Sequence, residues 1–136
     1  MKTALLLTLI LITGSTMAQS SPVDSRLDQC LNGASTTAAM SACYNEASQA
    51  WDSEMNHQYG KLMGKLTGEP KNKLRMAQRA WLAYRDSWLE ASQSRYRDQG
   101  TLRALSLSAQ AVSLVRNQAR MLQSLNDGSC ANPDDC

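Results

Sequence analysis

Amide, aromatic and charged side chains gather at helical spacing in one part of this sequence, and their types could support catalysis, ion binding or a buried polar network. Gln78, Trp81 and Arg85 lie three and four residues apart, and Asp86 follows Arg85 directly. On a helix this spacing places the first three on one face, and the apolar residues of the segment predict that this face points inward. An inward arginine needs a group that accepts its hydrogen bonds. The identity of that group decides whether the cluster is a site or a structural contact.

A catalytic histidine would have to be His57, the single histidine of the chain. Glu54 lies three residues before it and could orient it as a general base. We favour a solvated histidine on the outer side of a helix, because neither a nucleophile motif nor a phosphate-binding loop accompanies the pair. Asp52 and Glu54 cannot flank a substrate bond, because two residues apart on a helix they point in different directions. We therefore expect no enzyme activity.

Four cysteines, Cys30, Cys43, Cys130 and Cys136, could form disulfides or bind a metal. An even count in an oxidising compartment favours two disulfides. Three pairings are open in principle. We favour Cys30 with Cys43, which would staple a helical hairpin, and Cys130 with Cys136, which would close a short tail loop. We expect no metal site and no cofactor, because no Cys-x-x-Cys pair occurs and His57 lies far from the cysteines in sequence.

The first residues are typical of a cleavable secretory signal. Lys2 supplies the positive end, an apolar stretch follows over Ala4–Ile12, and the small-residue cleavage site ends at Ala18. The apolar stretch is too short to span a bilayer. Since no cysteine follows the cleavage site directly, we predict no lipid anchor. The expected product is a single domain over residues 19–136 that is periplasmic or secreted.

The charge balance bears on the class of partner. Removing residues 1–18 takes away Lys2 and leaves 13 basic and 12 acidic residues, a formal charge of +1. Such a balance gives no long-range attraction toward nucleic acid or acidic lipid. We therefore expect neither a nucleic-acid partner nor a membrane anchor after cleavage.

The elements that position these residues are predicted to be helices, because apolar residues recur every three or four positions and no strand-like alternation of useful length appears. The predicted helices are 23–31, 37–67, a third that starts at Pro70 and ends before Gly100, and a fourth over 102–125. The third should bury one stripe, namely Leu74, Ala77, Trp81, Tyr84, Trp88 and Ala91. The fold class is thus all-α: a small, disulfide-stapled four-helix domain with a long antiparallel helical hairpin.

That hairpin predicts which polar residues meet. Its turn lies near residues 68 and 69, so equal rise along both arms pairs positions whose numbers sum to roughly 137. The pairs expected on this basis are Asp52 with Arg85, Asn56 with Trp81, and Tyr59 with Gln78. We predict a semi-buried network with a structural role, made of Asp52, Asn56, Tyr59, Gln78, Trp81, Arg85 and Asp86.

A pattern of residues along most of the chain resembles a known family. Its members here are Thr37, Met40, Cys43, Asp52, Asn56, Tyr59, Leu74, Gln78, Trp81, Arg85, Asp86, Arg120 and Leu125. The pattern is similar to the exported bacterial family named for the lysozyme inhibitor LprI, over about Cys30 to Leu125. The resemblance implies a non-catalytic, lysozyme-inhibitor-like binding protein that protects the bacterial envelope, and it makes Cys30 with Cys43 the family-like pairing.

The alternative function is a general periplasmic interaction or envelope-stress module, so the expected partner is lysozyme or another envelope protein. Animal lysozymes are strongly basic, and an inhibitor with an overall charge of +1 has no acidic field to attract them. The inhibitory surface is therefore expected on a loop or tail. Three segments qualify: Gly33–Thr36, Thr67–Pro70, and the acidic end with Asp134 and Asp135.

Overall fold

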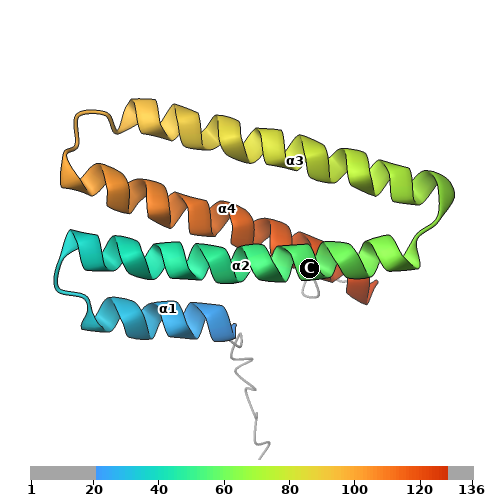
Figure 1. The fold of residues 1–136 in the computed structure, drawn as a ribbon, viewed down its shortest axis with the longest axis horizontal. Helices are drawn as coiled ribbons and strands as arrows, with labels where there is room; N and C mark the ends of the chain where they lie inside the picture. The colour runs from blue at the N-terminus through green and yellow to red at the C-terminus, as the bar shows by residue number, and fades with distance from the viewer. Residues whose placement is uncertain (1–20, 129–136) are drawn as a thin grey trace, which may run out of the picture.

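The computed structural model describes residues 21–128, which form an elongated bundle of helices (Figure 1). The helices are α1 (Pro22–Gly33), α2 (Thr37–Lys65), α3 (Gly68–Arg95) and α4 (Thr101–Asp127). Residues 21–128 contain no strand, and the predicted all-α fold with four helices is confirmed.

The helix ends follow from local side-chain chemistry. Ser21 and Thr36 cap α1 and α2, each accepting a hydrogen bond at 3.1 Å from the backbone N–H three residues further on. Gly128 ends α4 in the left-handed conformation, with φ of 75°. The third helix begins at Gly68, two residues before the predicted start at Pro70. Pro70 is tolerated in this first turn because the N–H that it lacks would have no partner within the helix.

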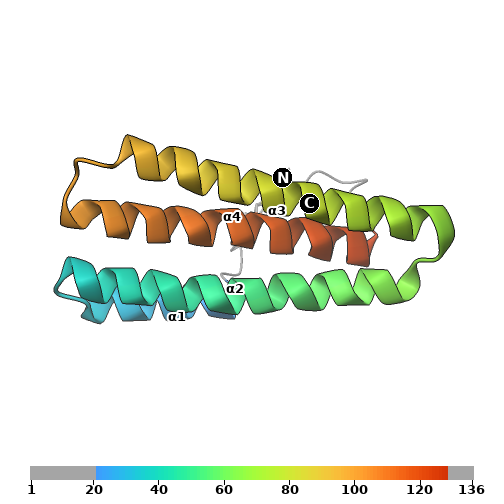
Figure 2. The ribbon, with the colours of Figure 1, turned by 45° about the horizontal axis from the view of Figure 1, so that its top comes forward.

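The core lies between α2 and α4, which run parallel to each other and side by side (Figures 1 and 2). The helix α1 packs against α2, and α3 lies along the other side of α4 (Figure 2). The buried apolar side chains come from α1, α2 and α4: Leu27, Cys43, Ala47, Trp51, Met55, Leu62, Val112, Val115, Ala119 and Leu122.

The peripheral position of α3 corrects the stripe predicted for that helix. Leu74 and Trp81 do pack against the core. Tyr84 and Trp88, however, are 53% and 48% exposed. The prediction of this stripe assumed that α3 would cover a hydrophobic face of α2. In the structure α4 takes that place on α2, so α3 packs mainly on α4 and presents most of its surface to solvent.

One disulfide links the first two helices. Cys30 in α1 and Cys43 in α2 are bonded, with their Cα atoms 5.7 Å apart, which confirms the predicted pairing. The predicted pairing of Cys130 with Cys136 and the signal peptide over residues 1–18 lie outside the described residues. Within the described range, each helix is too short or too polar to cross a bilayer.

Candidate binding surfaces

A polar cleft of about 500 Å³ lies between α2 and α3. From α2 it is lined by Asp52, Met55, Asn56 and Tyr59, and from α3 by Arg75, Gln78, Arg79 and Leu82. Four of the residues predicted to form a network, Asp52, Asn56, Tyr59 and Gln78, therefore surround one space. They form a cleft and not a filled contact, because α3 is supported by α4 and does not close onto α2 along its length.

Gln78 is the polar residue that holds α3 to the core. Its side chain is buried, and Nε2 donates to Sδ of Met55 in α2 at 3.6 Å. Its Oε1 accepts from Nε2 of Gln118 in α4 at 2.9 Å. One amide side chain thus joins three helices. On the wall formed by α2, Nδ2 of Asn56 donates to Oδ2 of Asp52 at 3.1 Å.

The structure does not form the expected ion pair between Asp52 and Arg85. Nε of Arg85 donates at 2.9 Å to Oδ1 of the adjacent Asp86, and the guanidinium lies 5.5 Å from the centroid of the Trp81 ring. The helix arithmetic holds only roughly close to the turn, where Gln78 lines the same cleft as its predicted partner Tyr59 but donates to Met55, one helical turn away. It fails further along because α2 and α3 diverge with distance from the turn, as both ribbon views show (Figures 1 and 2).

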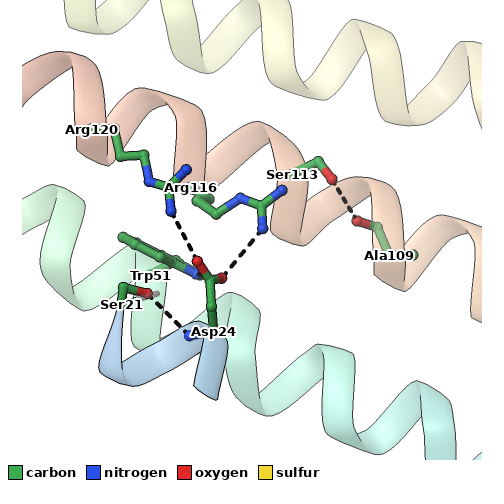
Figure 3. A network of polar contacts seen from close by, with 7 residues as sticks. All are labelled: Ser21, Asp24, Trp51, Ala109, Ser113, Arg116 and Arg120. Carbon is green, nitrogen blue, oxygen red and sulfur yellow. Dashed lines mark hydrogen bonds and ion pairs between the residues drawn. The ribbon is translucent and has the colours of Figure 1, made fainter. Parts of the chain in front are cut away.

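A second polar cluster, centred on Asp24, joins α1, α2 and α4 (Figure 3). Oδ1 of Asp24 accepts from Nε1 of Trp51 and from Nη1 of Arg116, both at 3.3 Å. Oδ2 accepts from Nη2 of Arg120 at 2.9 Å, and the Arg120 guanidinium lies 5.5 Å from the centroid of the Trp51 ring. The Asp24 side chain is only 15% exposed, so this carboxylate is an interior anchor for two arginines.

Two features of the sequence point to this cluster, which was not among the predicted contacts. Arg116 and Arg120 lie four residues apart and flank the inward positions Val115 and Ala119, so both needed an acceptor near the core. Asp24 stands three residues after the N-cap Ser21, a position that fixes its carboxylate at the start of α1. Pairing them required knowing that the start of α1 lies beside α4, which local sequence does not reveal.

The groups considered for catalysis lie on the surface. Nδ1 of His57 is 3.8 Å from Oε2 of Glu54, and their side chains are 63% and 38% exposed. The other carboxylate oxygen of Glu54 accepts from Nε2 of Gln58 at 2.7 Å. Among residues 21–128, no three His, Cys, Asp or Glu side chains are grouped to bind a metal ion.

The turn between α2 and α3 projects beyond the end of α4 (Figure 1). Its residues, Thr67–Pro70, are all exposed. Gly68 adopts φ of 61°, a left-handed conformation that favours glycine. Thr67 is the N-cap of α3, but its side chain makes no capping hydrogen bond. The turn therefore presents the uncapped N-terminus of a long helix at one end of the molecule.

Comparisons with known proteins agree with this architecture. The crystal structure of an uncharacterized protein from Burkholderia thailandensis matches with a TM-score of 0.74 and 28% sequence identity. The match covers 82% of this chain and 56% of the other, so this chain corresponds to little more than half of that protein. No curated protein matches this chain. The family model described as lysozyme inhibitor LprI matches residues 29–124, which reach from α1 to α4. The chain therefore belongs to the LprI lysozyme inhibitor family.

Proposed function

We propose that this protein is an exported, non-catalytic inhibitor that binds lysozyme and thereby protects the bacterial envelope. The observation that carries the proposal is the family match over residues 29–124. The disulfide between Cys30 and Cys43 supports export, since such bonds persist in oxidising compartments. The signal-like residues 1–18 support it as well.

Among the three segments considered for inhibition, the geometry favours the turn Thr67–Pro70. This turn projects past α4 and leaves the first N–H groups of α3 without a side-chain cap. The turn that contains Gly33–Thr36 differs, because the Thr36 hydroxyl already caps α2. The acidic end with Asp134 and Asp135 lies outside the described residues.

The exposed start of α3 suits the chemistry of a lysozyme cleft. That cleft carries two catalytic carboxyl groups, one of them ionised. A helix N-terminus offers N–H donors that can bind a carboxylate, and the negative charge of Glu69 in the same turn is paired with Lys73 at 2.9 Å. A narrow turn backed by two helices also has the shape needed to enter a cleft. We infer that Thr67–Pro70 occupies the substrate cleft and excludes the cell-wall glycan.

A lysis assay tests this proposal. Lysozyme is mixed with cell walls and with the mature protein, residues 19–136, and the loss of turbidity is followed. Thr67→Trp adds bulk at the projecting turn, and Ser35→Trp is the matched control at an exposed position in the turn between α1 and α2. We expect the wild-type and Ser35→Trp proteins to slow lysis and Thr67→Trp to be at least tenfold weaker. Equal inhibition by both variants would remove the assignment to this turn.

A second candidate function is a periplasmic interaction module with a partner other than lysozyme. The polar cleft between α2 and α3 favours it, because the Tyr59 hydroxyl lines the cleft without a hydrogen-bond partner among residues 21–128. Pull-down from a periplasmic extract should then recover a protein that is not a muramidase, and Tyr59→Phe should weaken its capture. Unchanged capture by Tyr59→Phe would contradict a role for the cleft.

A further inference from the structure

The solvent side of α3 carries an uncharged surface that runs along most of the helix. We define the outer face of α3 as nine exposed residues: Met76, Ala77, Ala80, Ala83, Tyr84, Ser87, Trp88, Ala91 and Ser94. Met76 is 70% exposed, and the Tyr84 and Trp88 rings contact each other edge to face at 6.2 Å. From Met76 to Ser94 the face extends about 27 Å at 1.5 Å per residue. An uncharged aromatic surface of this length is typical of an interaction site.

Charged residues border one edge of this face. Arg79, Asp86 and Glu90 lie within about 40° of one another around the helix, at 100° per residue. Arg79 and Glu90 have no hydrogen-bond or ion-pair partner among residues 21–128. Asp86 contacts Arg85 through Oδ1 alone, which leaves Oδ2 free. Along this edge of the helix, the positive charge of Arg79 is thus followed by the negative charges of Asp86 and Glu90.

We propose that the outer face of α3 is a self-association surface on which two copies of this chain pair through antiparallel α3 helices. In antiparallel helix pairs, residues that flank the same side of the two interfaces meet each other. With the symmetry axis between Leu82 and Ala83, opposed residues have numbers that sum to about 165. Arg79 of one copy then lies opposite Asp86 of the other. A parallel pairing would instead place this edge against the other edge of the partner's outer face.

Side-chain size is also complementary in this register. Trp88 of one copy lies opposite Ala77 of the other, whereas Tyr84 lies opposite Trp81 and next to Ala80. The Trp88 ring thus faces a small residue, which allows close approach of the two helices. A single helix pair belongs to the smaller class of protein interfaces, so we expect micromolar affinity. The antiparallel arrangement places the two Thr67–Pro70 turns at opposite ends of the dimer, away from its symmetry axis.

Sedimentation velocity of the mature protein across the micromolar range tests the proposal. We expect the wild-type protein to shift from monomer to dimer with concentration. Ala83→Glu puts like charges together near the axis and should weaken association at least tenfold. Ala42→Glu is the matched control, because Ala42 is an exposed helical alanine on α2. Far-UV circular dichroism confirms that each variant is folded.

A charge exchange tests the register. Arg79→Glu and Asp86→Arg should each weaken association, because each places like charges opposite one another, and the double variant should restore it. A wild-type protein that stays monomeric up to several hundred micromolar would overturn the proposal. An unchanged dimerisation affinity in Ala83→Glu would overturn the proposal too, since association would then use another surface. Loss of lysozyme binding in Ala83→Glu, with no dimer in the wild type, would assign the face to lysozyme instead.

Discussion

Oδ2 of Asp24 in α1 accepts a hydrogen bond at 2.9 Å from Arg120 in α4, although 96 residues separate the two in sequence. The same carboxylate also accepts from Trp51 in α2 and from Arg116 in α4. The short helix α1 is therefore attached to both core helices by one largely buried carboxylate, and to α2 by the disulfide as well. The Asp24 contacts help to hold α1 against the other helices, because α1 contributes only Leu27 to the buried apolar core.

Removing this carboxylate should destabilise the fold. Asp24→Ala leaves the Trp51 N–H and two arginines without their acceptor. We expect the free energy of unfolding to fall by about 2 to 3 kcal/mol, given the typical cost of losing hydrogen bonds to a mostly buried charge. Denaturant unfolding followed by circular dichroism measures the change.

Two control variants separate this contact from general effects. Asp28→Ala removes an exposed carboxylate from the same helix and should change stability by less than about 0.5 kcal/mol. Arg120→Ala should cost about 0.5 to 1 kcal/mol, because the Arg120 side chain is half exposed. If Asp24→Ala proved as mild as Asp28→Ala, the anchoring role of Asp24 would be wrong.

The disulfide should add stability by restricting the unfolded chain. Cys30 and Cys43 are separated by 13 positions, and closing a loop of about 15 residues is worth roughly 3 kcal/mol in the chain-entropy model. The Cys30→Ala/Cys43→Ala variant should therefore lose about 2 to 3 kcal/mol while keeping its helical spectrum. An unchanged midpoint of urea unfolding would show that the Asp24 contacts alone hold α1 in place.

Arg85 and Gln78 should differ in their effect on stability. Arg85 is half-buried and interacts with its exposed neighbour Asp86 and with the Trp81 ring, so Arg85→Ala should cost about 0.5 to 1 kcal/mol. Gln78→Ala removes the side chain that joins α2, α3 and α4, and should cost about 1 to 2 kcal/mol. Thermal unfolding of the two variants side by side measures the difference. If Arg85→Ala lost more stability than Gln78→Ala, the buried structural role predicted for Arg85 from the sequence would be right after all.

The helices could be predicted from the sequence, but the order in which they pack against one another could not. Capping residues and apolar spacing predicted four helices, with shifts of a few residues at their ends. Equal rise from the turn correctly brought Tyr59 to the same cleft as Gln78, whereas Trp81, the predicted partner of Asn56, does not line that cleft. The sequence did not show that α4 would lie against α2, because the apolar stripes of several helices could have covered the apolar face of α2. The position of α4 explains why Arg85 misses Asp52 and why Trp88 is exposed.

The peripheral packing of α3 predicts a gradient of local stability. Its buried side chains are Gln78 and Ser92, whereas α4 buries Val112, Val115 and Ala119 in the core. Amide hydrogens of α3 should therefore exchange faster than those in the middle of α4, since local opening exposes less apolar surface. Hydrogen exchange read by mass spectrometry at low micromolar concentration measures this. Equal protection of the two helices would contradict the loose attachment of α3.

Calorimetric titration of lysozyme with the mature protein tests the central claim most directly. We predict saturable binding of one lysozyme per chain, and weaker apparent affinity when a chitin oligosaccharide already fills the lysozyme cleft. The competition follows because the turn Thr67–Pro70 and the glycan would occupy the same space. If the oligosaccharide left the affinity unchanged, the contact would lie elsewhere on lysozyme. The absence of binding to several lysozyme types would contradict the account.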